Sequence, residues 1–231
     1  MKHVQLTICI IISLIFMEQT LLAQNNDWPN LARYREDNLK IGLSATGENR
    51  IVFMGNSITE GWSRVYPEFF INKSYINRGI SGQTTPQMLV RFRADVVNLK
   101  PKVVVILAGT NDIAGNTGPS TLEMIEDNIV SMVEIAKANN IAVVLCSVLP
   151  AFDYPWKPGL NPSEKIVNLN KWIKDYADNN EIIYVDYFTP MADERNGLKK
   201  EYSEDGVHPN LAGYKVMVPL VELAIAKALA E

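Results

Sequence analysis

The chain has 231 residues, a formal net charge of −4 and a hydrophobic fraction of 47%. A mildly acidic chain without clustered Lys and Arg argues against a nucleic-acid-binding protein, because phosphate backbones are bound by basic patches. Only two histidines and two cysteines are present. This supply is poor for a zinc site, which needs several such ligands, so we expect no metal.

The first 23 residues are typical of an export signal. Lys2 and His3 precede an apolar run from Val4 to Met17, and Ala23 stands before the polar Gln24. The run is shorter than the ~20 residues that a spanning helix needs, which favours cleavage after Ala23 over retention as an anchor. We therefore expect a periplasmic or extracellular protein with no stable membrane insertion once the signal is removed.

About 200 residues remain, which is within the range of one domain. We divide the chain into a signal peptide (1–23), an N-terminal extension (24–49) that is polar and helix-like at best, and one main domain (50–231). Cys146 lies in an apolar run and is expected to be buried rather than reactive. The sequence leaves the oligomeric state open.

Short β-branched runs alternate with longer segments of helical spacing along the main domain. The expected strands are 51–54, 74–77, 103–107, 141–145 and 182–185, and the expected helices are 85–99, 120–139, 162–179 and 211–230. The strands are apolar along their whole length, which indicates a parallel sheet covered by helices on both faces. The sequence thus predicts an α/β fold.

The ligand site of such a sheet lies beyond the carboxyl ends of its strands. Chemically useful side chains follow the strands in this chain. They occur in the segments 55–59, 78–82, 108–112 and 147–150, and in the loop that carries Asp205 and His208. A hydroxyl, a glycine turn, a carboxamide, a carboxylate and an imidazole are therefore expected to meet at one edge of the sheet.

These side chains together suit acyl transfer. Ser57 needs a base to become a nucleophile, and His208 is the one histidine outside the predicted signal. Asp205 is spaced to hold the other ring nitrogen of His208. The N–H groups of Ser57 and Gly82 and the side-chain amide of Asn111 are the expected donors to an oxyanion.

Four blocks in this order resemble those of the SGNH hydrolases, also called GDSL-type esterases and lipases. The blocks are Gly55-Asn56-Ser57-Ile58, Gly79-Ile80-Ser81-Gly82, Gly109-Thr110-Asn111-Asp112 and Asp205-Gly206-Val207-His208-Pro209. The resemblance implies a flavodoxin-like three-layer α/β/α sandwich with strand order 2-1-3-4-5, and hydrolysis of carboxylic esters without a cofactor. Asn56 and Ile58 replace the aspartate and leucine of the family's name motif, which puts the local hydrogen bonding of that motif in question.

Each block also has an ordinary structural interpretation. Gly-Asn-Ser after a strand is a common turn and helix cap, and Asp205-Gly206 is a good turn dipeptide. Asp112 follows Asn111 directly and competes with Asp205 as the acid, although its expected role is to accept hydrogen bonds in its own loop. An α/β-hydrolase would show G-x-S-x-G, but Thr59 stands at the second glycine position.

The substrate is less determined. Trp62, Tyr154 and Trp156 are candidates for substrate contact, the last two in a loop (151–159) expected to overhang the site. Export and the absence of an amphipathic lid pattern favour an acetylesterase acting on O-acetylated carbohydrate, as a small molecule or a glycan. The alternatives are a lysophospholipase or short-chain acyl thioesterase, and a non-catalytic carbohydrate-binding module on the same scaffold.

Overall fold

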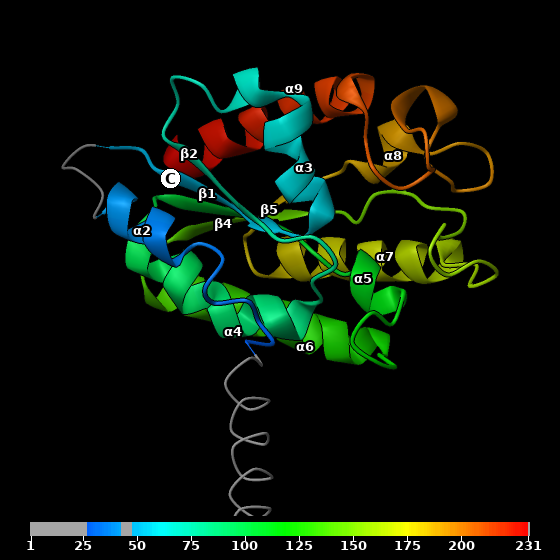
Figure 1. Cartoon of the computed structure of the whole chain (residues 1–231), viewed down its shortest axis with the longest axis horizontal. Helices are drawn as coiled ribbons and strands as arrows, with labels where there is room; N and C mark the ends of the chain where they lie inside the picture. The colour runs from blue at the N-terminus through cyan, green and yellow to red at the C-terminus, as the bar shows by residue number, and fades with distance from the viewer. Residues whose placement is uncertain (1–26, 43–47, 231) are drawn as a thin grey trace, which may run out of the picture.

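A parallel five-stranded sheet with helices on both faces forms the molecule (Figure 1). The computed structural model describes residues 27–42 and 48–230. The strands are β1 (Ile51–Gly55), β2 (Tyr75–Gly79), β3 (Val103–Leu107), β4 (Ala142–Cys146) and β5 (Ile183–Val185). Their order is β2-β1-β3-β4-β5, so the predicted α/β sandwich and strand order are confirmed. Because β1 lies inside the sheet with its carboxyl end at the order reversal, the residues that follow it stand where ligands bind in such folds.

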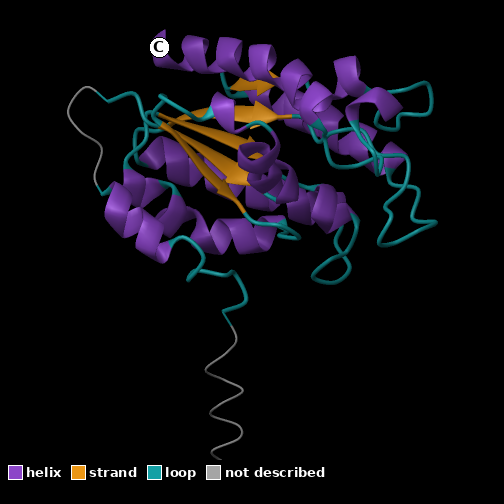
Figure 2. Cartoon of the chain, turned by 45° about the horizontal axis from the view of Figure 1, so that its top comes forward, coloured by secondary structure: helices purple, strands orange, loops and turns teal. Residues whose placement is uncertain are grey.

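Alternate side chains of the strands pack into two separate hydrophobic cores, one on each face of the sheet. Val104 and Ile106 of β3 face a core made with α4 (Thr85–Asp95), α6 (Leu122–Ala138) and α7 (Ser163–Asn179). Val103, Val105 and Leu107 face a second core made with α3 (Ser57–Val65) and α9 (Leu211–Ala230). Figure 2 shows the sheet between these two helical layers. Burial of both faces explains why the strands are apolar at every position rather than at every second one.

The longer helices agree with the expected segments to within a few residues, with one exception. The helices are α2 (Arg35–Ile41), α3 (Ser57–Val65), α4 (Thr85–Asp95), α5 (Thr110–Ile113), α6 (Leu122–Ala138), α7 (Ser163–Asn179), α8 (Phe188–Met191) and α9 (Leu211–Ala230), with short 3-10 turns at Pro67–Phe69, Val97–Leu99 and Lys200–Tyr202. The exception is α4, which ends four residues before the expected position. Val96 leaves the helical conformation (φ −124°), and the chain continues as the 3-10 turn Val97–Leu99 up to the break before Pro101.

Helix α3 was not among the expected helices, yet it begins at Ser57 itself. Its first residues follow β1 after a single intervening residue, Asn56. Its apolar residues Ile58, Trp62 and Val65 have helical spacing, but the segment is only nine residues long and contains Gly61, so the sequence signal was weak. The nucleophile candidate therefore lies on a helix terminus and not in an irregular loop.

The N-terminal strap, defined here as residues 27–42, lies against β2 and α4 (Figure 1). Tyr34 donates a hydrogen bond to the carbonyl of Gly79 at the end of β2, and Asn38 donates to Asp95 at the end of α4 (2.8 Å). The predicted signal segment, 1–23, lies outside the described residues. Within the part of the chain that the structure describes, no helix has the length and apolar character needed to cross a membrane.

Candidate active site

Ser57 stands at the first residue of α3, directly beyond the carboxyl end of β1. The side chain of Asn56 caps this helix by accepting a hydrogen bond from the N–H of Ile58 (3.0 Å). An aspartate would accept the same bond, so the exchange of aspartate for asparagine keeps the cap. Gly79 allows α3 to approach β2, because a Cβ there would lie 2.1 Å from the backbone nitrogen of Glu60.

His208 and Asp205 complete a relay with Ser57. The Nε2 atom of His208 is 2.9 Å from Ser57 Oγ, and its Nδ1 atom is 2.6 Å from Asp205 Oδ2. Both distances are hydrogen-bond distances, and the two ring nitrogens face different partners. The arrangement is that of a nucleophile, a base and an orienting carboxylate.

Asp205 is held by its own loop. Its Oδ1 atom accepts the backbone N–H groups of Val207 (2.9 Å) and His208 (2.8 Å) and the hydroxyl of Ser203 (3.1 Å). Partial burial opposes ionisation, but the hydrogen bonds from His208 and Val207 outweigh it and lower the pKa of Asp205 to about 2. The carboxylate therefore stays ionised at any pH at which the protein is expected to work.

The glycine turn after β2 brings backbone donors to the same edge. Gly82 has φ 78°, a left-handed conformation that favours glycine. Neither the N–H of Ser57 nor that of Gly82 donates to another described residue. The Nδ2 atom of Asn111 donates one hydrogen to the carbonyl of Gln83 (2.9 Å), which leaves its second hydrogen for another acceptor.

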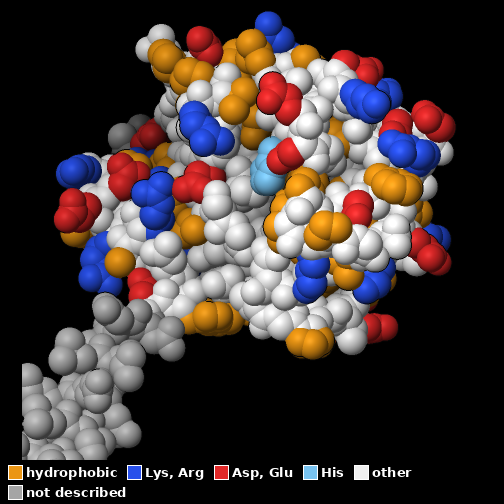
Figure 3. Space-filling view, turned by 45° about the vertical axis from the view of Figure 1, so that its right-hand side comes forward, with side chains coloured by type: hydrophobic (Ala, Val, Ile, Leu, Met, Phe, Trp, Pro, Cys, Tyr) orange, Lys and Arg blue, Asp and Glu red, His pale blue; other side chains and the backbone are white. Residues whose placement is uncertain are grey.

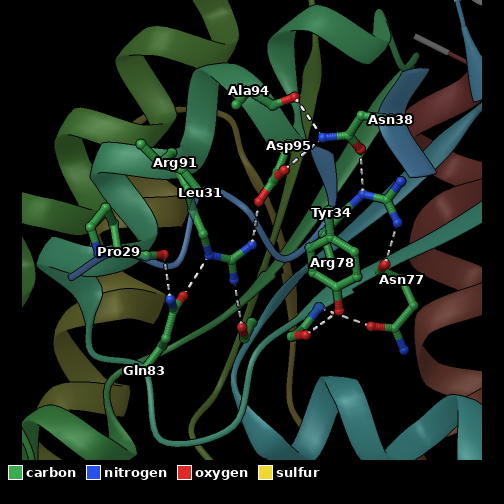
Figure 4. A network of polar contacts seen from close by, with 12 residues as sticks. Pro29, Leu31, Tyr34, Asn38, Asn77, Arg78, Gln83, Arg91, Ala94 and Asp95 are labelled. Carbon is green, nitrogen blue, oxygen red and sulfur yellow. Dashed lines mark hydrogen bonds and ion pairs between the residues drawn. The ribbon is translucent and has the colours of Figure 1, made fainter. Parts of the chain in front are cut away.

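A buried polar network braces this turn (Figure 4). The Oε1 atom of Gln83 accepts a hydrogen bond from Arg91 Nε (2.5 Å), and Arg91 also pairs with Asp95 (2.9 Å). A third bond runs from Arg91 to the carbonyl of Gly55 at the end of β1 (3.0 Å). Arg91 is 0% exposed, so these partners satisfy a guanidinium that has no access to water. The network thus ties the strand end before Ser57 to the turn after Gly82.

The N-terminal strap contributes to the same network (Figure 4). Gln83 Nε2 donates to the carbonyl of Pro29 (2.7 Å). Asn38 bridges Asp95 (2.8 Å) and Arg78 Nε (2.9 Å). The extension therefore forms part of the support of the site, a role that its polar composition did not reveal.

Asp112 lies on the other side of Asn111 from the relay. Its carboxylate accepts the N–H (2.9 Å) and the hydroxyl (2.6 Å) of Thr85, at the start of α4. Burial raises the pKa of Asp112 to about 6. It makes no hydrogen bond to His208, and its contacts join α5 to α4.

A cleft of 610 Å³ opens beside Ser57 and His208. Its walls include Arg33 of the strap, Glu60 and Arg64 of α3, and Ser81 of the glycine turn. Arg33 pairs with Glu60 at 3.0 Å, and Ser81 donates its N–H (2.9 Å) and its hydroxyl to the same carboxylate. Figure 3 shows the pale-blue histidine side chain at the surface, next to a carboxylate, on this hollowed face.

Comparison of the sequence with models of protein families shows which family the chain belongs to. The model of the GDSL-like lipase/acylhydrolase family matches residues 53–216, which is most of the main domain. The chain belongs to this family. It is therefore a hydrolase of the GDSL-like esterase group, as the four blocks predicted.

One solved structure and two curated proteins illustrate the similarity. A GDSL-like lipase from Bacteroides thetaiotaomicron is 48% identical with a TM-score of 0.86, and the match covers 87% of this chain and 100% of that one. Esterase TesA from Pseudomonas aeruginosa is 26% identical over 175 residues, 74% of this chain and 80% of its own. An uncharacterized lipoprotein, YqeF from Bacillus subtilis, is 30% identical over 129 residues, 48% of this chain and 53% of that protein. The match thus spans about half of the length of YqeF.

None of the three aromatic residues expected to contact substrate lines the cleft of this GDSL-like protein, and two of them are buried. Trp62 is 2% exposed and stacks on Phe69 (4.7 Å) and Tyr214 (5.1 Å), because it occupies the inward face of α3. Tyr154 is 0% exposed, with its hydroxyl 2.8 Å from that of Thr110. Both expectations were wrong, since aromatic side chains also serve to fill cores.

Trp156 differs from these two because it is exposed near His208, although it does not line the cleft. It is 44% exposed, stacks on Tyr154 (4.9 Å) and has its ring centre 6.0 Å from that of His208. Its Nε1 atom donates to Asn116 (3.3 Å), and Asn116 donates to the carbonyl of Gly82 (3.2 Å). The loop that carries Trp156 therefore flanks the site, and the buried ring of Tyr154 supports the ring of Trp156 by stacking.

The described residues contain no group of three or more His, Cys, Asp or Glu arranged to hold a metal ion. Cys146, which the sequence placed in the core, is buried, and burial raises the pKa of its thiol to about 12. Gln83, Arg91, Glu60 and Arg33 are the site residues that motif analysis missed. The available signal was the four-residue spacing of Arg91 and Asp95, which places opposite charges on one face of α4.

Proposed function

We propose that this esterase removes small acyl groups, acetyl foremost, from O-acylated carbohydrate through an acyl-enzyme on Ser57. The observation that carries the proposal is the relay with Ser57 Oγ 2.9 Å from His208 Nε2 and His208 Nδ1 2.6 Å from Asp205. A base within 2.6–3.2 Å of the hydroxyl can take its proton during attack.

In this proposal Ser57 Oγ attacks the ester carbonyl carbon while its proton passes to His208 Nε2. The resulting oxyanion receives hydrogen bonds from the N–H groups of Ser57 and Gly82 and from the free amide hydrogen of Asn111. When the intermediate collapses, His208 gives its proton to the departing alcohol oxygen. Water then attacks the acyl-enzyme with His208 as base, and the acid is released with Ser57 restored.

The composition of the cleft supports a small acyl group and a polar alcohol. Apart from His208, every residue that lines the cleft has a charged side chain, a hydroxyl side chain or, in glycine, no side chain. The lining residues are Arg33, Ser57, Glu60, Gly61, Ser63, Arg64, Ser81 and His208. A long acyl chain would need an apolar groove, because each buried methylene is worth about 0.8 kcal/mol. The more apolar hollow of 490 Å³, between α2 and the turn 97–99, contains none of these residues.

Export is part of the proposal and rests on the predicted signal segment. The Bacillus subtilis relative is named as a lipoprotein, which favours a location beyond the cytoplasmic membrane for related chains. An extracytoplasmic, polar ester is in keeping with acetylated glycan as the substrate class.

One observation favours a second candidate, a lysophospholipase or short-chain thioesterase. Trp156 is exposed near His208, and Phe152 in the same loop is 43% exposed. These two rings offer the apolar surface that a longer acyl chain would contact. We rank this candidate second because neither ring lines the cleft beside Ser57.

A panel of 4-nitrophenyl esters from acetyl to palmitoyl, run beside acetylated mono- and oligosaccharides, separates the candidates. We expect kcat/KM to be highest for acetyl and to fall with each added methylene pair, and we expect acetate release from the sugars. Ser57→Ala is the control for background hydrolysis. A preference for palmitoyl would contradict the acetylesterase proposal and favour the lipid substrate. Absence of turnover on every ester would favour the non-catalytic carbohydrate-binding module.

A further inference from the structure

We infer that Arg64 forms an anion subsite in the cleft, and that the preferred substrate is an acylated sugar that carries a carboxylate. The inference rests on the proposed function and deepens it by naming the substrate class. It starts from the face that α3 presents to the cleft.

Ser57, Gly61 and Arg64 lie on one face of α3. Residues four and seven positions apart project from the same side of a helix, and all three line the same cleft. Seven residues advance roughly 10 Å along a helix axis. The Arg64 guanidinium folds back toward Gly61, where a Cβ would lie 4.0 Å from its Nη2 atom, so its charge lies nearer to Ser57 than this advance. A monosaccharide with its substituents can span the remaining distance, with its ester at Ser57 and its carboxylate at Arg64.

The charges along this face are unequal. Glu60 is already engaged by Arg33 (3.0 Å) and by Ser81 (2.9 Å from its N–H), so its negative charge is compensated within the wall of the cleft. Arg64 is exposed and makes no hydrogen bond or ion pair with a described residue. A guanidinium presents donors in a planar fork that matches a carboxylate.

A second hollow beside His208 carries the opposite charge. It is lined by Glu204 and Asp205 together with His208, and by Val65 at the end of α3. An anionic substituent is therefore repelled from this hollow and attracted to Arg64. The two charges favour one orientation, with the carboxylate at Arg64 and the ester at Ser57.

The test compares matched series of mono-O-acetylated methyl glucuronides and methyl glucosides, which differ in the carboxylate. We expect the wild type to show kcat/KM about tenfold or more higher on its best glucuronide than on the matching glucoside, the usual contribution of a hydrogen bond to a charged group. Arg64→Gln is expected to remove most of this preference while changing kcat/KM on the glucoside less than about twofold, and Arg64→Lys is expected to keep part of it. Arg93→Gln, an exposed arginine of α4 outside the cleft, is the charge-matched control and should keep the full preference.

Equal kcat/KM on the two series in the wild type, or an equal loss on both in Arg64→Gln, would overturn the inference. Failure of the proposed function is distinguished by 4-nitrophenyl acetate, which the wild type must hydrolyse if it is an esterase of this kind. Calorimetry on Ser57→Ala gives an answer independent of turnover. We expect the acetylated glucuronide to bind and the additional Arg64→Gln change to weaken binding about tenfold, whereas unchanged affinity would reject the subsite.

Discussion

The two halves of the site are held in place in different ways. The acid–base loop, residues 203–209, is half exposed and is organised by bonds between neighbours, with Asp205 accepting from residues two and three positions away. The proposed oxyanion side is organised by buried residues far apart in the chain, with Gln83 contacting Pro29, Arg91 and Asn111. The Asp205–His208 pair is thus positioned by its own loop, whereas alignment of the proposed oxyanion donors depends on contacts across the whole domain.

The largest effect is expected from removing the base. His208→Ala should lower kcat by about 10⁴-fold or more, because no other histidine lies among the described residues to take the proton of Ser57. Thermal unfolding should stay close to wild type, since the loop is exposed. The measurement is kcat on 4-nitrophenyl acetate, and retention of more than about 1% of wild-type activity would rule out the assigned role.

The next largest effect is expected from changing the carboxylate that orients His208, and it distinguishes Asp205 from Asp112 in that role. Asp205→Asn should lower kcat by about 10²–10⁴-fold, because the wrong tautomer of His208 is then favoured. Asp112→Asn should lower it far less, since Asp112 bonds to Thr85 and not to His208. Side-by-side kinetics of the two variants decide the assignment, and a smaller loss in Asp205→Asn would reverse it.

The oxyanion side offers a test of non-local support. Asn111→Ala should lower kcat by about 10²–10³-fold with little change in KM, as loss of one oxyanion donor usually does. Gln83→Ala should lower kcat by about 10–100-fold through misplacement of Asn111 and the turn.

If Gln83 acts through Asn111, the double variant should be no slower than Asn111→Ala alone. Multiplicative losses would show that Gln83 acts independently of Asn111. Gln83→Glu, which keeps the acceptor for Arg91, is the matched control and should recover part of the activity.

The smallest expected effect concerns stability rather than chemistry. The folded-state pKa of Asp112 is about 6 against an ordinary 3.8, so the folded state holds its proton more tightly between these pH values. The contribution of Asp112 to stability is then complete below about pH 4 and is lost as the pH rises through about 6. Relative to Asp112→Asn, the wild type should lose about 3 kcal/mol of unfolding free energy over that interval. Urea unfolding at several pH values measures it, and parallel curves for the two proteins would refute the buried-carboxylate account.

The contrast between local and long-range contacts also explains which features could be predicted from the sequence. The strands and the triad candidates were predictable, because β-branched runs and the Asp205-to-His208 spacing are local patterns. The strand order was implied by the resemblance of the four blocks to the SGNH hydrolases. The network around Gln83 and Arg91 was not, since its members come from the strap, β1 and α4 and share no motif. Trp62 failed for a related reason: a helical residue near the nucleophile can face either the cleft or the core, and only packing against Phe69 and Tyr214 decides which.

Covalent labelling of Ser57 by a fluorophosphonate probe, followed by peptide mass spectrometry, tests the central claim most directly. We predict about one label per chain, on the peptide that contains Ser57, no label in Ser57→Ala and much slower labelling in His208→Ala. An unlabelled wild type, or equal labelling of Ser57→Ala, would contradict a serine nucleophile activated by His208.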